Sequence, residues 1–409
     1  MDAGFAAPTD LVVGSPRKLG VNFARSWCNL FVVGAASAER TRQQLASLAA
    51  SGLDQRTFAS TAIPLLQKAV PFDASCTAGL DPATLLVTDT FKLAIDDDHD
   101  QEWAQYEYQI DDVAKFVDLA RRKDPVTTVE IETGGDVSRS LRHSEFLRPN
   151  FRFGHELRAA LRVEGATWAA FCLFRQEGSS DFSPAEVGFI ESITESFALG
   201  MRMGLLAAAA TAEPSMHGPS VLIVGADDSV DQLSPGADSR LAELGGDVAV
   251  GRLPMHLLTL VAAARAFARG EYPAAPRLRV RSRSGEWLVA HASTLAARDG
   301  SGSSVVITIE EARPPEIVPL VVAAFGLSPR EQEVVRLVLQ GVDTAQIAAA
   351  LHLSAYTVQD HLKSIFAKAG VRSRRELTAK VFFDQYASRL GGAVGPSGWF
   401  VEDQVGAPL

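Results

Sequence analysis

The residues whose types and spacing offer the clearest recognition chemistry gather in one short segment near the C-terminus. A helix that buries Val358, Leu362 and Ile365 on one side turns the polar side chains between them outward. Such a helix fits the major groove of DNA, where Gln can pair with adenine, Asp can accept from cytosine N4, and Lys can reach guanine or phosphate. On this helix and just after it, we expect the following DNA-contacting residues: Tyr356, Thr357, Gln359, Asp360, Lys363, Ser364, Lys368, Arg372, Ser373 and Arg374.

Capping signals around this helix predict the elements that position it. Four residues have the type and position of helix N-caps, and three of them are followed by Glu or Gln at capping-box spacing: Ser328, Asp343, Ser354 and Ser373. Gly341 and Gly370 sit where helices should stop. A tight turn at residues 352–353 joins the second helix to the third, so the segment is predicted to be a four-helix domain that contains a helix-turn-helix.

Residues 327–377 resemble the LuxR/FixJ-type helix-turn-helix family over the whole segment. The resemblance rests on these matches: Leu327-Ser328-Pro329-Arg330-Glu331, Gly341, Ile347-Ala348, Thr357-Val358-x-x-His361 and Gly370-Val371-x-Ser373-Arg374. It implies binding to a specific duplex operator in a promoter as a homodimer, and contact with RNA polymerase if the protein activates. The alternative is a four-helix cap whose charged face is simply solvated.

One departure from the family pattern concerns the residues after Thr-Val. The family usually has Lys there, and that Lys contacts DNA, whereas this chain has Gln359-Asp360. Lys363 is therefore the stronger candidate for a groove contact, and Asp360 stands equally open as a contact or a non-contacting residue. The fourth helix, Arg374 to Phe383, is expected either to form the dimer surface or to pack within the domain, through Leu377, Val381 and Phe382.

Composition and charge agree with a small DNA-binding unit on an acidic body. The 409 residues carry a net charge of −10, with 47% hydrophobic and 22% charged residues, which excludes wholesale disorder. Residues 320–390 hold 9 basic and 6 acidic residues, net +3, whereas the rest is acidic. Cys28, Cys76 and Cys172 form no CxxC pair, so we expect neither structural zinc nor a disulfide framework, but a reducing, cytoplasmic location. No apolar stretch is long enough to span a membrane, and no membrane contact is expected.

Two proline-containing segments, Ala207 to Ser220 and Glu311 to Pro319, are predicted linkers. They divide the chain into residues 20–206, 219–312 and 320–390. The first part alternates strand and helix signals, and the second is predicted as a strand, helices and three strands. The expected fold class is therefore multidomain: two α+β domains followed by an all-α domain.

The two α+β parts also resemble known families. Residues 20–206 look like a GAF domain, through Val70-Pro71-Phe72-Asp73, the hairpin around Leu80 to Thr84, and the closing hairpin and helix from Glu156 to Phe197. Residues 219–312 more faintly resemble a PAS-type sensor, through Val221 to Val224, Ala226-Asp227 and the last three strands. The whole chain is similar to actinobacterial regulators that join such parts to a LuxR-type domain. That similarity implies an unidentified small-molecule or protein signal at the N-terminal domains.

Two other classes of function stay open beside this one. A catalytic GAF-like domain would need a metal-ligand cluster or paired reactive cysteines, and the sequence shows neither, so no catalytic residue and no cofactor is expected. The acidic run Asp96 to Asp100 is more typical of a solvated loop than of a cation site. His143, His155 and Cys172 fit structural roles better than haem ligation. The remaining alternative is a dimerisation scaffold that answers to no ligand.

Overall fold

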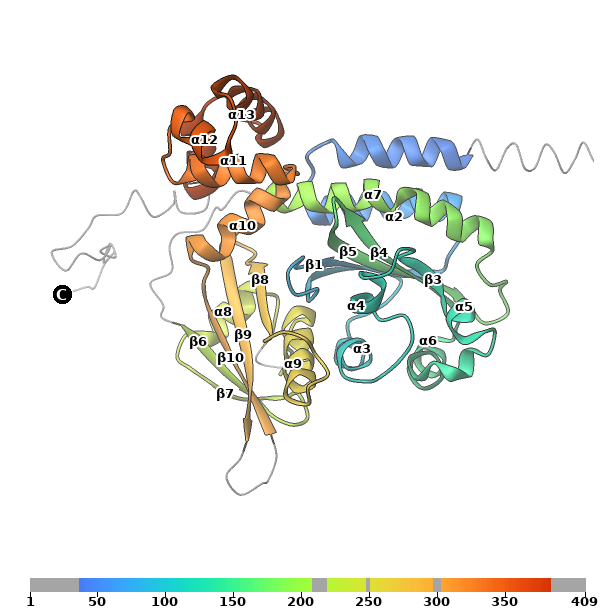
Figure 1. Ribbon diagram of the computed structural model, residues 1–409. Coiled ribbons are helices and arrows are strands. Elements are labelled where there is room, and N and C mark those ends of the chain that lie inside the picture. The colour runs from blue at the N-terminus through green and yellow to red at the C-terminus, as the bar shows by residue number, and fades with distance from the viewer. Residues whose placement is uncertain (1–36, 208–218, 248–250, 297–302, 384–409) are drawn as a thin grey trace, which may run out of the picture.

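The computed structural model describes residues 37–207, 219–247, 251–296 and 303–383, which form two sheet-containing domains and a C-terminal helical domain (Figure 1). Each sheet has five antiparallel strands. The chain is thus mixed α and β in its N-terminal part and helical at its C-terminal end. None of the helices in these described ranges is both long and apolar enough to cross a bilayer.

The first sheet has the strand order β2-β1-β5-β4-β3. Its strands are β1 (Ala74–Leu80), β2 (Val87–Leu93), β3 (Val126–Thr128), β4 (Phe153–Val163) and β5 (Ala166–Gln176). The predicted closing hairpin is confirmed: β4 and β5 pair across a turn at Glu164 and Gly165, both with positive φ. The predicted hairpin of β1 and β2 is confirmed as well, whereas the short edge strand β3 was not foreseen.

Helices cover both faces of this sheet. The helical residues 37–49, α2 (Gln55–Ala69) and α7 (Pro184–Ala207) lie on one face, and short helices lie on the other (Figure 1): α3 (Asp100–Tyr108), α4 (Phe116–Leu119), α5 (Val129–Thr133), η1 (Val137–Arg139), η2 (Arg142–Leu147) and α6 (Arg148–Phe151). Two glycines let α2 and α7 approach closely. A Cβ atom at Gly200 would lie 2.2 Å from the Phe58 ring, and one at Gly204 would lie 2.7 Å from the backbone nitrogen of Gln55.

The second sheet has the order β7-β6-β10-β9-β8, which is the order of the first sheet when its strands are numbered along the chain. Its elements are β6 (Ser220–Val224), β7 (Val230–Leu233), α8 (Ala237–Glu243), α9 (Met255–Ala268), β8 (Arg277–Arg281), β9 (Trp287–Ala296) and β10 (Ser303–Glu311). All were foreseen except β7. Helix α9 packs against its own sheet and also against α3 and β2 of the first domain.

The second predicted linker is wrong over residues 314–319, because they begin helix α10 (Pro314–Ala324). Pro314 and Pro315 occupy the first turn, where a missing N–H costs nothing, and Ile317, Leu320 and Val321 are buried. Helix α10 packs against α7. The loop after it also touches α7, since Gly326, with φ +65°, lies against the Arg202 guanidinium group.

The C-terminal domain contains the predicted helices α11 (Pro329–Leu339), α12 (Thr344–Leu351) and α13 (Ala355–Ala369). The predicted fourth helix divides into α14 (Arg374–Thr378) and a π-helical turn η4 (Ala379–Phe383). Residues 208–218 of the first predicted linker lie outside the described residues. The same holds for residues 20–36 and 384–390, which belong to the expected first and third domains.

Candidate DNA-binding site

The helix-turn-helix is built from capped helices, as its sequence predicts. Ser328 and Glu331 form a reciprocal capping box at the start of α11, and Asp343 and Gln346 form another at α12. The Ser354 hydroxyl accepts a hydrogen bond of 3.0 Å from the Thr357 amide at the start of α13. His352 ends α12 in the left-handed region, at φ 54°, and this residue turns the chain from α12 into α13. These local bonds determine where α11, α12 and α13 begin.

Helix α13 buries one side and exposes the other. Val358, Leu362 and Ile365 are buried, as the spacing predicted. The opposite side carries polar residues that the structure leaves exposed: Tyr356, Gln359, Asp360 and Lys363. Tyr356 is 72% exposed, which is unusual for so large an aromatic residue. This face of α13 presents the donors, acceptors and aromatic ring that base edges and phosphates can meet.

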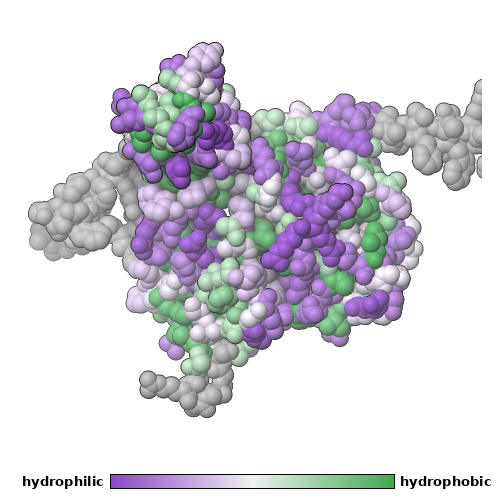
Figure 2. Space-filling view, viewed as in Figure 1, coloured by the Kyte–Doolittle hydropathy of each residue, from purple (hydrophilic) through white to green (hydrophobic). Residues whose placement is uncertain are grey.

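The charged side chains on this face are exposed and accessible to a nucleic acid. Lys363 and Asp360 form an ion pair of 3.3 Å, with side chains 75% and 48% exposed. Exposed pairs of this kind contribute about 1 kcal/mol or less, so DNA phosphate can compete for Lys363 at little cost. Hydrophilic residues dominate the visible surface of this domain at the top of Figure 2, with smaller apolar areas between them.

Two of the expected DNA contacts are instead bonded inside the domain. Glu331, which is 5% exposed, accepts hydrogen bonds from the Ser364 hydroxyl at 2.5 Å and the Lys368 ammonium at 2.7 Å. Burial alone would raise the pKa of Glu331, but bonds from Lys368, Ser364 and Ser328 outweigh it and lower the pKa to about 2. Glu331 therefore joins α11 to α13, whereas its sequence position predicts only a capping role.

The residues after α13 also divide between internal and exposed roles. Arg374 donates to the Val342 carbonyl and to the Thr344 hydroxyl, both at 2.8 Å, and so braces the start of α12. Ser373 caps α14, and the Thr357 hydroxyl lies 2.8 Å from that of Ser354. Arg372 is exposed. The strongest candidates for direct contact are thus on the outer face of α13 and at Arg372.

The expected dimer surface on the fourth helix is mostly internal. Leu377 and Val381 are completely buried in the domain, which agrees with the alternative of intramolecular packing. Phe382 is half-buried and lines a groove of about 580 Å³ between α10 and α11. The apolar side chains of that groove come from both helices: Val318, Val322, Val335 and Leu339.

The acidic run Asp96 to Asp100 and His155 have internal partners in the first domain. The Lys92 ammonium binds the Asp97 and Asp100 carboxylates and the Asp96 carbonyl, and no group of metal-ligating side chains occurs among the described residues. His155 contacts Glu130 at 2.6 Å, whereas His143 is buried.

The cysteines are closer than their spacing suggested. Cys76 and Cys172 face each other on β1 and β5, a pairing that only the sheet register reveals. Burial raises the pKa of Cys76 to about 12 and that of Cys172 well above its usual value, so both thiols are poor nucleophiles.

Comparisons with known proteins concern the C-terminal domain. The family model described as "Bacterial regulatory proteins, luxR family" matches residues 326–381. A Mycobacterium bovis protein named as an HTH-type transcriptional regulator is 46% identical over 52 residues, 13% of this chain and 6% of the relative. An Aeromonas salmonicida protein named in the same way is 47% identical over 51 residues, 12% of this chain and 26% of the relative. The C-terminal domain is therefore a LuxR-family helix-turn-helix domain.

These sequence matches cover only a small part of each protein. The chain spans only 6% of the length of the Mycobacterium relative and about a quarter of the Aeromonas one. A crystal structure of a Vibrio cholera VqmA–ligand–DNA complex aligns at 16% identity over 42% of this chain and 85% of that one. Its TM-score is 0.20, which is too low to show a common fold.

Proposed function

We propose that this protein is a cytoplasmic transcriptional regulator that binds a specific duplex operator as a homodimer. The observation that carries the proposal is the outer face of α13, where Tyr356, Gln359 and Lys363 stand exposed on a LuxR-family domain. Gln359 can pair with adenine in the major groove, and Lys363 can reach guanine or phosphate. RNA polymerase is a further partner if the protein activates.

The two sheet domains are proposed to receive the signal. The GAF-like assignment of residues 20–206 and the PAS-like assignment of residues 219–312 are supported by two α+β units with the same strand order. The contact of α10 with α7 gives a signal a physical path, because α7 belongs to the first domain and α10 leads directly into α11. A small-molecule effector that changes this contact would change how the DNA-binding domains are presented.

Selection of random duplex DNA by the full-length protein, at fixed salt, tests the proposal. We expect enrichment of a site with two-fold symmetry and half-sites about one helical turn apart. The Lys363→Ala variant should bind that site about tenfold more weakly or worse, because a groove contact contributes about 1–3 kcal/mol.

Lys123→Ala is the matched control, since Lys123 is an exposed lysine of the first domain. It should bind as the parent protein does. Enrichment of no site, in the presence or absence of cell extract, would reject the regulator in favour of a scaffold or an enzyme. Equal affinity of Lys363→Ala and the parent would reject the assignment of this face of α13.

A further inference from the structure

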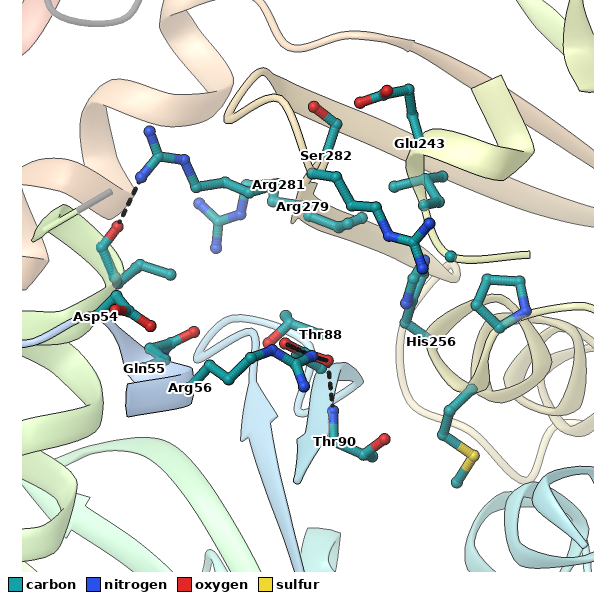
Figure 3. Close-up of a pocket in the computed structure, with 18 of the residues that line it drawn as sticks. Asp54, Gln55, Arg56, Thr88, Thr90, Glu243, His256, Arg279, Arg281 and Ser282 are labelled. Atoms are coloured by element: carbon teal, nitrogen blue, oxygen red, sulfur yellow. Dashed lines mark hydrogen bonds and ion pairs between the residues drawn. The ribbon is translucent and has the colours of Figure 1, made fainter. Parts of the chain in front are cut away.

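Strand β8 and the turn after it carry arginines at every second position: Arg277, Arg279, Arg281 and Arg283. Side chains alternate between the two faces of a strand, so the residues between them, Leu278 and Val280, are buried in the core of the second domain. Arg279, Arg281 and Arg283 line a cleft of about 740 Å³ that faces the first domain (Figure 3). Helices α2 and α7 and strand β2 supply the opposite wall.

Neighbouring arginines of this row differ in their partners. Arg279 is buried, and it donates to both carboxylate oxygens of Asp81, at 2.8 and 2.5 Å. Arg281 donates only to two carbonyls, those of Gly285 at 3.1 Å and Leu205 at 3.2 Å, and its guanidinium group lies over the Trp287 ring. No carboxylate pairs with Arg281 among the described residues. Burial lowers the pKa of Arg281 to about 10, which still leaves it charged at neutral pH.

Arg283 adds a second cation without an acidic partner in the described part of the chain. It is exposed and donates to the Ala242 carbonyl at 3.4 Å. The imidazole of His256 also lines the cleft, is 7% exposed, and has no hydrogen-bond partner for Nε2 within those same residues. A guanidinium group has five N–H donors, so Arg281 and Arg283 together keep several donors free for a ligand.

Each carboxylate that lines the cleft has a hydrogen-bond or ion-pair partner other than Arg281 and Arg283. Asp89 pairs with Arg56 at 3.2 Å, and Asp97 and Asp100 pair with Lys92. The other two have local bonds: Asp54 caps α2 through Thr57, and Glu243 accepts from the Ser284 amide at 3.1 Å. Asp97 also pairs with Arg252 of the second domain at 2.8 Å. Every carboxylate of the cleft therefore has a partner, whereas no carboxylate pairs with Arg281 or Arg283 among the described residues.

We propose that this cleft binds a small organic oxyanion, a phosphate ester or a polycarboxylate, through Arg281 and Arg283. Guanidinium groups bind phosphate and carboxylate through paired N–H donors, and such charge-assisted bonds are stronger than neutral ones. The volume of the cleft falls within the range of small-molecule sites. Arg56 and Thr90 on the facing wall, labelled in Figure 3, can contact the part of the ligand that Arg281 does not reach.

Calorimetric titration of the full-length protein tests the site with two probes, pyrophosphate and citrate, against sodium chloride at matched ionic strength. We expect saturable binding of at least one probe. The Arg283→Gln variant should weaken it about tenfold, since a hydrogen bond to a charged group contributes about 1.5–3 kcal/mol. Preference for pyrophosphate would indicate a phosphate ester, and preference for citrate a polycarboxylate. The assay contains no DNA, so its result is independent of the proposed regulatory function.

Two further variants keep the test decisive. Arg277→Gln removes an exposed arginine of the same strand that does not line the cleft, and it should bind both probes as the parent does. Arg281→Lys keeps the charge but not the fork of donors, so binding should weaken without loss of folding. Absence of saturable binding by the parent protein, or equal binding by Arg283→Gln and the parent, would overturn the proposal.

Discussion

The two sheet domains share a strand order but differ in the side chains on the helix-covered face of the sheet. In both, helices inserted between the second and third strands cover one face of the sheet. Under those helices the first sheet buries an ion network: Glu156 accepts from Arg142 and Arg158, each at 3.0 Å, and Arg158 also binds Glu107. The corresponding face of the second sheet is aliphatic, with Leu278, Leu288, Val305 and Ile307 at its centre.

The difference shows where an external ligand can act. In the first domain the buried charges neutralise one another, and Arg158 also stacks on Phe116 with 4.0 Å between guanidinium carbon and ring centre. In the second domain the corresponding interior is apolar. Arg281 and Arg283, which no carboxylate neutralises among the described residues, lie instead at the cleft between the two domains, where the ligand site is proposed.

Breaking the ion network should have the largest effect. Arg158→Met leaves Glu156 and Glu107 buried without this partner, and we expect a loss of about 3–5 kcal/mol in the free energy of unfolding. The matched control is Arg148→Gln. Arg148 pairs with Glu177, and the Arg148 side chain is 61% exposed. That change should cost less than about 1 kcal/mol in denaturant melts. Equal costs would mean that the network contributes nothing beyond surface pairing.

The aliphatic face should respond to a cavity instead. Ile307→Ala should lower the free energy of unfolding by about 2–4 kcal/mol, because Ile307 is completely buried on β10.

The dependence of stability on pH distinguishes Arg158→Met from Ile307→Ala. Burial raises the pKa of Glu156, but Arg142 and Arg158 outweigh it and lower the pKa to about 2.

The stability that Glu156 contributes is therefore present above pH 4.5 and is lost as the pH falls toward 2. The deficit of Arg158→Met should shrink as the pH is lowered to 4, whereas that of Ile307→Ala should stay constant. Urea melts at pH 7 and pH 4 measure both, and parallel behaviour of the two variants would contradict the contrast.

A smaller effect should come from His256, at the start of α9. Burial lowers its pKa to about 4, so the folded protein holds it neutral. Stability is then complete above the unfolded value near pH 6.5 and is lost as the pH falls toward 4. At pH 5, which is about 1.5 pH units below the unfolded pKa, the loss is about 2 kcal/mol. His256→Gln should remove this part of the decline in melts between pH 7 and 5; an unchanged decline would exclude His256 as its source.

The smallest change concerns the facing thiols of the first sheet. In a Cys28→Ser background, Cys76 and Cys172 should react with a thiol reagent at least about a hundredfold more slowly in the native protein than in urea, because burial disfavours both thiolates. Replacing Cys76 with Ala should leave DNA binding unchanged. Fast native labelling would instead reopen the enzymatic reading of this domain.

Local signals made the DNA-binding domain predictable from sequence. Ser328, Asp343 and Ser354 specify their helices through bonds to residues three positions away, so the caps can be identified without a fold. Long-range partners could not be predicted in this way. Whether Lys368 faces DNA or Glu331 depends on how α11 packs on α13.

Two other features escaped prediction for related reasons. Two prolines suggested a linker at residue 314, although proline also suits a helical first turn. The pairing of Cys76 with Cys172 depends on a register between strands far apart in sequence. The alternating arginines of β8 were visible in the sequence, but only the fold shows that Arg279 pairs with Asp81 whereas Arg281 and Arg283 have no carboxylate partner among the described residues.

Helix α7 has a consequence for exchanging domains between proteins. Within its last turns, Gly204 packs on α2, the Leu205 carbonyl accepts a bond from Arg281, and Arg202 lies against Gly326. A chimera that replaces the first domain but ends its graft before residue 202 keeps the contacts of Arg202 and Leu205 with the other two domains. A graft that extends through residue 207 brings foreign side chains against both other domains at once. The practical boundary of the first module therefore lies inside a helix, and not at the proline-rich segment that follows it.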